Sequence, residues 1–268
     1  MRILTICLLL SAPALSQPVL TVTDARKSNP IAPYAYFFED STDKLTLTQL
    51  IKMPPEVFEP IHRKGTINYY TPPKIVWVRF AISNQTDAPL FLLTLQRAYE
   101  KLDVYVQDRT GQWTHQQAGN KQPIPNRLAP TAHPIVPLGL HPRWVYIAAV
   151  GGQRIIFTDL LRVSDIGYTI LERKITGFWQ GIVVGTYLLL LFYAIVFCIW
   201  LRYPILGCYA LFLFTNLHWF LFRSGYVEEL LGFDSSYFHY FHYYPIRYVF
   251  ALSWAVFHIK FLHLFPLG

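Results

Sequence analysis

Residues Ile175 to Leu201 form an unbroken run of 27 residues without a charged side chain. An α-helix rises about 1.5 Å per residue, so a run of this length can cross the hydrocarbon core of a bilayer, which is roughly 30 Å thick. The whole chain is 53% hydrophobic and 15% charged, whereas soluble domains carry about 25% charged residues. The sequence therefore predicts a membrane protein and argues against one large soluble enzyme.

The first residues have the pattern of a secretory signal. Arg2 precedes a short apolar run, residues 3–10, and small residues follow that run. We therefore predict a signal peptide over residues 1–16, cleaved before Gln17. The alternative is an uncleaved membrane anchor, although the run is shorter than a full span. Under both interpretations the residues that follow are exported.

Residues 17–172 are predicted to form one extracytoplasmic β-rich domain. From Val76 to Ile82 every second residue is Val, Phe or Ile, so these side chains share one face of the expected strand. Lys101 to Asp108 has the same period of two residues. Further strands are expected at 90–95, 144–150 and 154–161, and a helical turn at 46–53. Short strands with joints rich in Pro and Gly are typical of antiparallel sandwiches. The predicted fold class is an all-β, jelly-roll-like sandwich followed by α-helical transmembrane spans.

Residues 173–268 are predicted to be a membrane region. Three helices are expected in it, at about 176–201, 203–222 and 245–265. The third is the weakest, because Arg247 and Lys260 lie near its ends, but long basic side chains can reach the interface. If the domain before these helices is exported, the first helix runs inward and Arg202 is cytoplasmic.

The distribution of charge, cysteine and histidine excludes several kinds of site. The formal net charge is +7, but no long block of Lys and Arg occurs, so nucleic acid is not an expected partner. The three cysteines lie in apolar runs, at Cys7, Cys198 and Cys208, so the exported domain is expected to hold neither a disulfide nor a cysteine metal site. His239 and His242 fit an aromatic interface belt better than a metal site.

The exported domain lacks a recognisable catalytic motif. We find no nucleophile elbow, no zinc-binding helix motif and no phosphate-binding loop in its sequence. The chain is therefore not expected to be an enzyme, and no cofactor or metal is expected.

Several local patterns follow one another in a known order. In the exported part they are Trp77-Val-Arg79-Phe80 with Asn84, Leu102-Asp103-Val-Tyr105, Gly111, Gly119, Arg127, and strands around Tyr146 and Phe157. In the membrane part they are Gly181, Gly185, Tyr187 to Arg202-Tyr203, and Ser224-Gly225-Tyr226. In their order and spacing they resemble the bacterial seven-transmembrane receptors with diverse intracellular signalling modules, 7TMR-DISM, with the second type of extracellular domain found there.

This resemblance implies a multi-pass receptor in the bacterial inner membrane, with residues 17–172 in the periplasm or extracellular space. Such a receptor binds a small ligand, for which carbohydrates are a candidate class, and relays the signal by repacking its helices. The expected partners are this ligand, the lipid bilayer, and a second copy of the chain or a separate signalling protein. Family members have seven spans and a kinase or cyclase module, so three spans ending at Gly268 suggest a truncated or split gene product.

Four residues are candidates for ligand binding: Trp77, Arg79, Tyr105 and Arg127. Sugars bind to exposed aromatic faces that are flanked by planar hydrogen-bonding groups, and alternation places Trp77 and Arg79 on the face opposite the aliphatic one. The alternative, more common for aromatic residues on strands, is a packing role for Trp77 and a structural ion pair between Arg79 and Asp103.

Five residues are candidates for helix packing or for relaying a signal. Gly181 and Gly185 have the four-residue spacing of close helix packing or dimerisation. Asn216, His218 and His258 are polar residues at membrane depth, where side chains of this kind face partner helices. The alternative for these three is a plain hydrogen bond between helices, without a switching role.

Two further functions remain open. One is a membrane-tethered carbohydrate-active enzyme, which would need two carboxylates converging across a cleft. The other is a structural subunit that works with a separate signalling protein.

Overall fold

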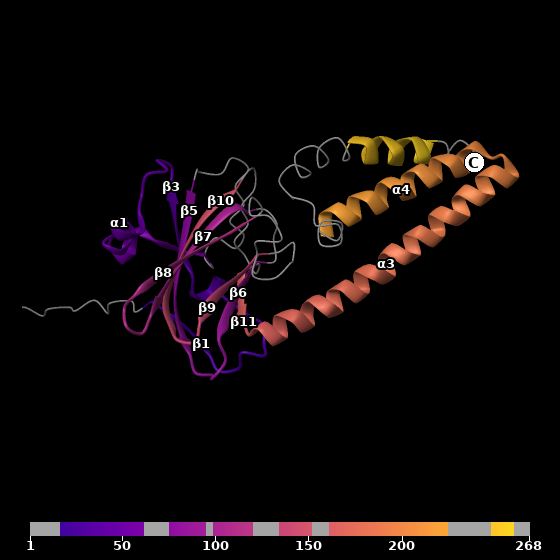
Figure 1. Ribbon diagram of the computed structural model, residues 1–268. Helices are drawn as coiled ribbons and strands as arrows, with labels where there is room; N and C mark the ends of the chain where they lie inside the picture. The colour runs from indigo at the N-terminus through magenta and orange to yellow at the C-terminus, as the bar shows by residue number, and fades with distance from the viewer. Residues whose placement is uncertain are drawn as a thin grey trace, which may run out of the picture.

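The computed structural model of the 268-residue protein describes residues 17–61, 75–94, 99–119, 134–151, 161–224 and 248–259. Figure 1 shows a β-sandwich from which the long helix α3 leaves, with α4 returning beside it. The predicted signal peptide, residues 1–16, and the predicted ligand residue Arg127 lie outside the described residues.

The larger sheet in the described part has seven strands. They are β1 (Val19–Val22), β3 (Tyr36–Asp40), β4 (Glu59–Pro60), β5 (Ile75–Asn84), β7 (Tyr99–Asp108), β8 (Trp113–Ala118) and β10 (Pro142–Gly151). The order is β4-β3-β5-β10-β7-β8, and β1 runs parallel to the second half of β5. The other pairings are antiparallel. Strand β10 therefore lies between two strands that precede it in the chain.

The smaller sheet has four strands in the described part, all antiparallel. They are β2 (Asn29–Pro30), β6 (Leu90–Thr94), β9 (Ile135–Gly139) and β11 (Leu161–Ser164), in the order β2-β11-β6-β9. The short 3-10 helix η1 (Ala32–Tyr34) links β2 to β3. Antiparallel sheets followed by helices confirm the coarse fold class, and the jelly-roll topology stays a prediction.

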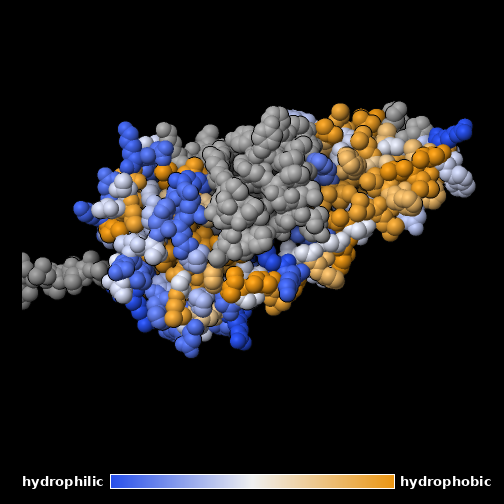
Figure 2. All heavy atoms as spheres, in the orientation of Figure 1, coloured by the Kyte–Doolittle hydropathy of each residue, from blue (hydrophilic) through white to orange (hydrophobic). Residues whose placement is uncertain are grey.

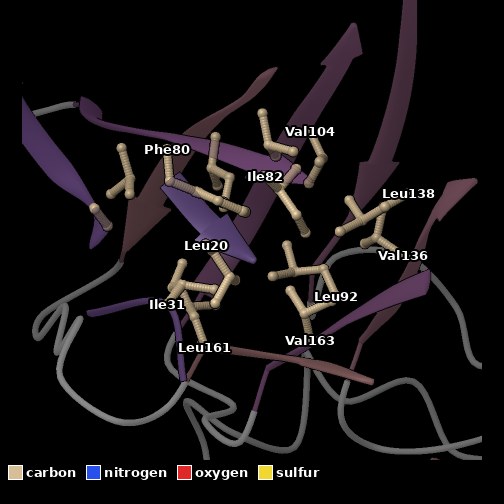
Figure 3. Close-up of a cluster of buried hydrophobic side chains, with 14 of the residues drawn as sticks. Leu20, Ile31, Phe80, Ile82, Leu92, Val104, Val136, Leu138, Leu161 and Val163 are labelled. Carbon is tan, nitrogen blue, oxygen red and sulfur yellow. The ribbon is translucent and has the colours of Figure 1, made fainter. Parts of the chain in front are cut away.

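The main core lies between the two sheets. Phe80 of β5 and Val104 of β7 face Leu92 of β6 and Val163 of β11 (Figure 3), and all four side chains are fully buried. Burying one such side chain contributes about 1.5–3 kcal/mol. The alternation predicted from Val76 to Ile82 is therefore confirmed on its inner side.

A short segment covers the other side of the larger sheet. It contains α1 (Leu47–Ile51) and the 3-10 helix η2 (Pro55–Val57). Thr46 and Gln49 form a capping box that starts α1, and Pro54 follows the helix. We call residues 45–58 the cover, because Leu50 and Phe58 pack on side chains of the sheet.

Helix α3 (Ile166–Leu201) is the one described helix that is long and apolar enough to cross a membrane. It contains the predicted span at 176–201 but begins earlier. We call Ser164 to Lys174 the joint, because this segment connects the sandwich to the apolar run. The joint is helical from Ile166 onward, because Asp165 caps the helix by accepting a hydrogen bond from the Tyr168 backbone N–H. Figure 2 shows hydrophobic side chains gathered over α3 and α4.

Helix α3 ends at a sharp return. Arg202 adopts the left-handed conformation, with φ of 55°, and α4 (Pro204–Ser224) follows. A further described helix, Tyr248–Ile259, is shorter. That α4 and the helix at 248–259 also cross a membrane stays a prediction.

Candidate functional site

The candidate ligand site lies on the outer face of the larger sheet, the face turned away from the smaller sheet. The strand register aligns four side chains in one row across β5, β10, β7 and β8, namely Arg79, Tyr146, Tyr105 and His115. A neighbouring row contains Trp77, Ala148, Asp103 and Gln117. Three of the predicted ligand residues, Trp77, Arg79 and Tyr105, are therefore brought together on one face.

The rings of Trp77, Tyr105 and His115 form a stacked series on this face, and we call these three residues the aromatic row. The Trp77 and Tyr105 ring centroids are 6.0 Å apart at 26°, because Ala148 between their strands leaves room for the indole. The Tyr105 and His115 rings are 4.6 Å apart at 18°. Trp77 is buried, Tyr105 is partly buried and the His115 side chain is 49% exposed. The aromatic row therefore runs from beneath the cover to the surface.

Asp103 fixes the polar side of the aromatic row. Its carboxylate accepts bonds from Lys101 Nζ at 2.8 Å, His115 Nε2 at 2.9 Å and Gln117 Nε2 at 3.3 Å. Burial by itself would raise the pKa of Asp103, but the hydrogen bonds from Lys101 and His115 outweigh it, so the pKa lies below its ordinary value. Asp103 is therefore a charged anchor that orients His115.

Arg79 is buried and points away from this anchor. Its guanidinium carbon lies 3.9 Å from the centroid of the Phe58 ring, and Nη2 donates a long bond of 3.4 Å to the Pro55 carbonyl. The ion pair between Arg79 and Asp103 considered from the sequence is not formed. Asp103 belongs to the neighbouring row two strands away, and it pairs with Lys101.

The cover explains why the side chains of Trp77 and Arg79 are not accessible to solvent. Leu50 and Phe58 pack on the outer face, and the Phe58 ring also lies 5.9 Å from the Phe38 ring. The relative exposure of Trp77 is 3% and that of Arg79 is 6%. In this structure both side chains therefore lie beneath the cover, and their role in ligand binding stays a prediction.

The accessible part of the site comes from residues that the sequence interpretation missed. His115 and Gln117 are exposed on β8, and Trp113 is partly buried beside Tyr146, with ring centroids 5.6 Å apart. These three side chains alternate along Trp113–Ala118 and share one face. That alternation was visible in the sequence and could have identified them.

A second candidate region is the joint between β11 and α3. The hydroxyl groups of Ser164 and Thr169 lie 3.0 Å apart and are buried. Thr169 also bonds the Asp165 carbonyl at 2.8 Å, and the Asp165 backbone N–H donates to the Ala25 carbonyl at 2.8 Å. The start of α3 is thereby fixed to the sandwich.

Charged and amide side chains add to the joint. Arg162 of β11 donates to Ser28 Oγ at 3.1 Å and lies 3.9 Å from Glu172 of α3. Asn29 Nδ2 donates to the Val163 carbonyl at 3.1 Å. The segment around β2, the last described strand and the first turns of α3 are therefore tied together by polar contacts.

Helix α4 and the helix at 248–259 share a polar contact. The hydroxyl groups of Thr215 and Ser253 lie 3.0 Å apart, and both side chains are buried. Sequence interpretation missed this pair. Of the predicted residues, Asn216 donates to the Phe212 carbonyl at 2.8 Å, and His258 Nδ1 lies 2.9 Å from the Trp254 carbonyl, each within its own helix.

The other predicted packing residues have different surroundings. The His218 ring lies 6.2 Å from the Phe214 ring. A Cβ atom added at Gly181 or Gly185 would meet nothing within 4 Å. Close helix packing at these glycines therefore stays a prediction. Among the described residues no group of three His, Cys, Asp or Glu side chains could hold a metal ion.

Comparison with known proteins identifies the sandwich. A search of the curated proteins found no match. Residues 32–158 match the family model described as 7TMR-DISM extracellular 2. This range begins at η1, includes the outer face with its aromatic row, and ends just before β11 and the joint. Residues 32–158 therefore form an extracellular domain of the second 7TMR-DISM type.

Proposed function

We propose that this chain is the sensor and membrane portion of a bacterial signal-transduction receptor. The sandwich lies outside the inner membrane and binds a small ligand, and the helices carry the signal inward. One observation carries the proposal: a domain of a receptor family is followed, through β11, by a helix that is long and apolar enough to cross a membrane.

The positions of two tryptophans support this placement of α3. Trp179 and Trp200 are 61% and 75% exposed, and tryptophan is enriched at both membrane interfaces. Trp200 follows Trp179 by 21 positions, which span about 32 Å of helix, close to the thickness of the hydrocarbon core. In this arrangement Ile166 to Phe178 stand outside the membrane, between the sandwich and the lipid.

The chemistry of the outer face supports a carbohydrate as the ligand. Tyr105 and His115 offer ring faces at the surface end of the aromatic row, and the amide of Gln117 and the ammonium group of Lys101 lie beside them. A sugar ring has apolar C–H faces with hydroxyl groups around its edge. These features suit stacked aromatic rings that have polar groups beside them.

The joint supports a mechanical relay. A ligand can shift the helices only by the difference in its affinity for two arrangements, commonly about 1–3 kcal/mol. A flexible linker between the sandwich and α3 would absorb the displacement of the sandwich that ligand binding produces. Ser164, Thr169 and Arg162 instead tie β11 to the first turns of α3, so movement of the sandwich tilts or rotates the helix.

The proposed ligand face is tested with the purified full chain in detergent micelles on an array of bacterial and plant oligosaccharides. We expect at least one glycan class to be retained, and we expect His115→Ala to weaken its binding about tenfold, as for loss of a stacking and hydrogen-bonding group. The control is His141→Ala, which changes an exposed histidine of the β9–β10 turn. Retention of no glycan, or equal binding by His115→Ala, would contradict the proposal.

A further inference from the structure

Arg79 is a buried charge without a counter-charge among the described residues. Its side chain is 6% exposed, its Nε has no hydrogen-bond partner there, and its one hydrogen bond is the long contact with the Pro55 carbonyl. The Phe58 ring attracts the cation but accepts none of its N–H groups in a regular hydrogen bond. Buried guanidinium groups are normally paired with a carboxylate or phosphate.

A second buried donor lies next to Arg79. Trp77 Nε1 has no hydrogen-bond partner in the described part of the chain, and Trp77 precedes Arg79 by two positions on the same face of β5. Two unpaired donors, one of them charged, therefore belong to the same face of β5, between the sheet and the cover. An unpaired buried donor is costly for a folded protein.

The described carboxylates of the outer face cannot serve these donors. Asp103 accepts bonds from Lys101, His115 and Gln117. Asp40 at the end of β3 is buried, and its two oxygens accept bonds from its own loop, from Thr42, Asp43 and Leu45. The described part of this face therefore offers no anionic acceptor to these two donors.

We infer that the ligand of the outer face carries a carboxylate that pairs with Arg79 and accepts a hydrogen bond from Trp77, so that the ligand is an acidic saccharide rather than a neutral one. The inference rests on the proposed function, since it specifies the ligand of the same face. The sugar ring stacks at Tyr105 and His115, and its carboxylate reaches inward along the aromatic row. A planar carboxylate matches the paired N–H groups of a guanidinium edge.

Entry of the carboxylate requires the cover to move. Both unpaired nitrogen atoms are buried, and Phe58 of the cover lies on the guanidinium group of Arg79. The ligand therefore displaces part of residues 45–58 from the sheet when it binds. Binding and a local rearrangement of the outer face are thereby one event.

The test uses the full chain in detergent micelles and two matched probes. One is a tetramer of galacturonic acid, and the other is the galactose tetramer of the same linkage, in which each carboxylate is replaced by an alcohol. Calorimetric titration is expected to give at least about tenfold tighter binding of the acidic tetramer, as for a charge-assisted pair in a buried site. Equal affinity for the two tetramers would overturn the inference.

Variants locate the effect. Arg79→Met keeps a long apolar side chain and is expected to remove the preference for the acidic tetramer, whereas the exposed control Arg143→Met should keep it. Trp77→Phe keeps a ring, removes the donor, and should weaken binding of the acidic tetramer several-fold. A preference that survives in both Arg79→Met and Trp77→Phe would contradict the assignment.

The wild-type comparison decides the inference even if a variant fails to fold. If neither tetramer binds, the inference of an acidic ligand is overturned. The proposed function is not, because the wider glycan array tests it separately. Equal binding of both tetramers that is lost in His115→Ala would leave the ligand face in place and remove only the carboxylate.

Discussion

The hydroxyl group of Ser164, the last residue of β11, lies 3.0 Å from that of Thr169 in the first turns of α3, and both side chains are buried. This contact joins the last described strand of the sandwich to the helix that is apolar enough to cross a membrane. Buried hydroxyl groups are paired because an unpaired one loses its bonds with water and gains none. The pair is therefore a direct link between the last described strand of the sandwich and α3.

Replacing Thr169 by Val keeps the shape of the side chain and removes its hydroxyl. We expect the free energy of unfolding to fall by about 0.5–1.5 kcal/mol, the usual net contribution of one hydrogen bond, because Ser164 Oγ then keeps only its long bond to the Asp165 carbonyl, at 3.3 Å. The measurement is denaturant unfolding of the sandwich in the full chain, followed by tryptophan fluorescence. The control is Thr186→Val, whose hydroxyl bonds a carbonyl of its own helix. An equal effect of the two changes would refute a special role for the pair.

The stability of the sandwich should depend on pH through Asp103. Its pKa in the folded protein is lower than the ordinary value of 3.8, so the unfolded chain takes up the proton first as the pH falls. The stabilising contribution is present above about pH 4, and it is lost as the pH falls toward the folded pKa. Unfolding curves between pH 6 and pH 3 should show a smaller loss of stability for Asp103→Asn than for wild type.

The matched control for this titration is Asp87→Asn, which changes a carboxylate in an exposed turn. Its stability should follow the wild-type curve over the same pH range. If Asp103→Asn also followed that curve, the bonds from Lys101 and His115 would not be the source of the pH dependence.

Helix α3 should hold a fixed orientation relative to the sandwich. With spin labels at Arg109 and Leu188 and the native cysteines replaced, pulsed electron resonance should give a narrow distance distribution in lipid nanodiscs. A Gly-Gly-Ser-Gly insertion after Lys174 should broaden it, because this sequence is flexible. An alanine-based insertion of seven residues, about two helical turns, should leave it narrow. A broad distribution in the wild type would exclude a rigid joint.

Removing the Ser253 hydroxyl should weaken the contact between α4 and the helix at 248–259. Such bonds contribute about 0.6 kcal/mol on average in membrane proteins, so Ser253→Ala should lower resistance to unfolding in SDS by a comparable amount. Thr186→Ala is the matched control. A loss no greater than that of Thr186→Ala would show that the Thr215 hydroxyl finds an equivalent partner elsewhere.

Local patterns predicted the sandwich well and the joint poorly. The alternation of Val78 and Phe80 with Trp77 and Arg79 identified β5 and its two faces, because a strand has a period of two residues. The charged residues Glu172 to Lys174 marked the edge of the apolar run, but a helix continues through charged residues as long as its backbone bonds are satisfied. The boundary was therefore set by Asp165, a capping residue, and not by hydropathy.

The site was only partly predictable, because its surroundings come from distant segments. Trp77 and Tyr105 were both identified as candidate ligand residues, but nothing near them in sequence indicates that Phe58 would cover Arg79. The partners of Asp103 lie on β7 and β8, and they depend on a register that the sequence does not state. Short-range periodicity thus predicted which residues share a face of a strand, whereas tertiary packing decides which of their side chains are accessible.

The most direct test of an exported sandwich joined to an inward-running helix is a pair of fusions in bacterial cells. Alkaline phosphatase, active only after export, and green fluorescent protein, which fluoresces in the cytoplasm, are each placed after Lys174 and after Arg202. We predict active phosphatase and no fluorescence after Lys174, and fluorescence without phosphatase activity after Arg202. Fluorescence after Lys174 would place the sandwich in the cytoplasm and contradict the receptor function.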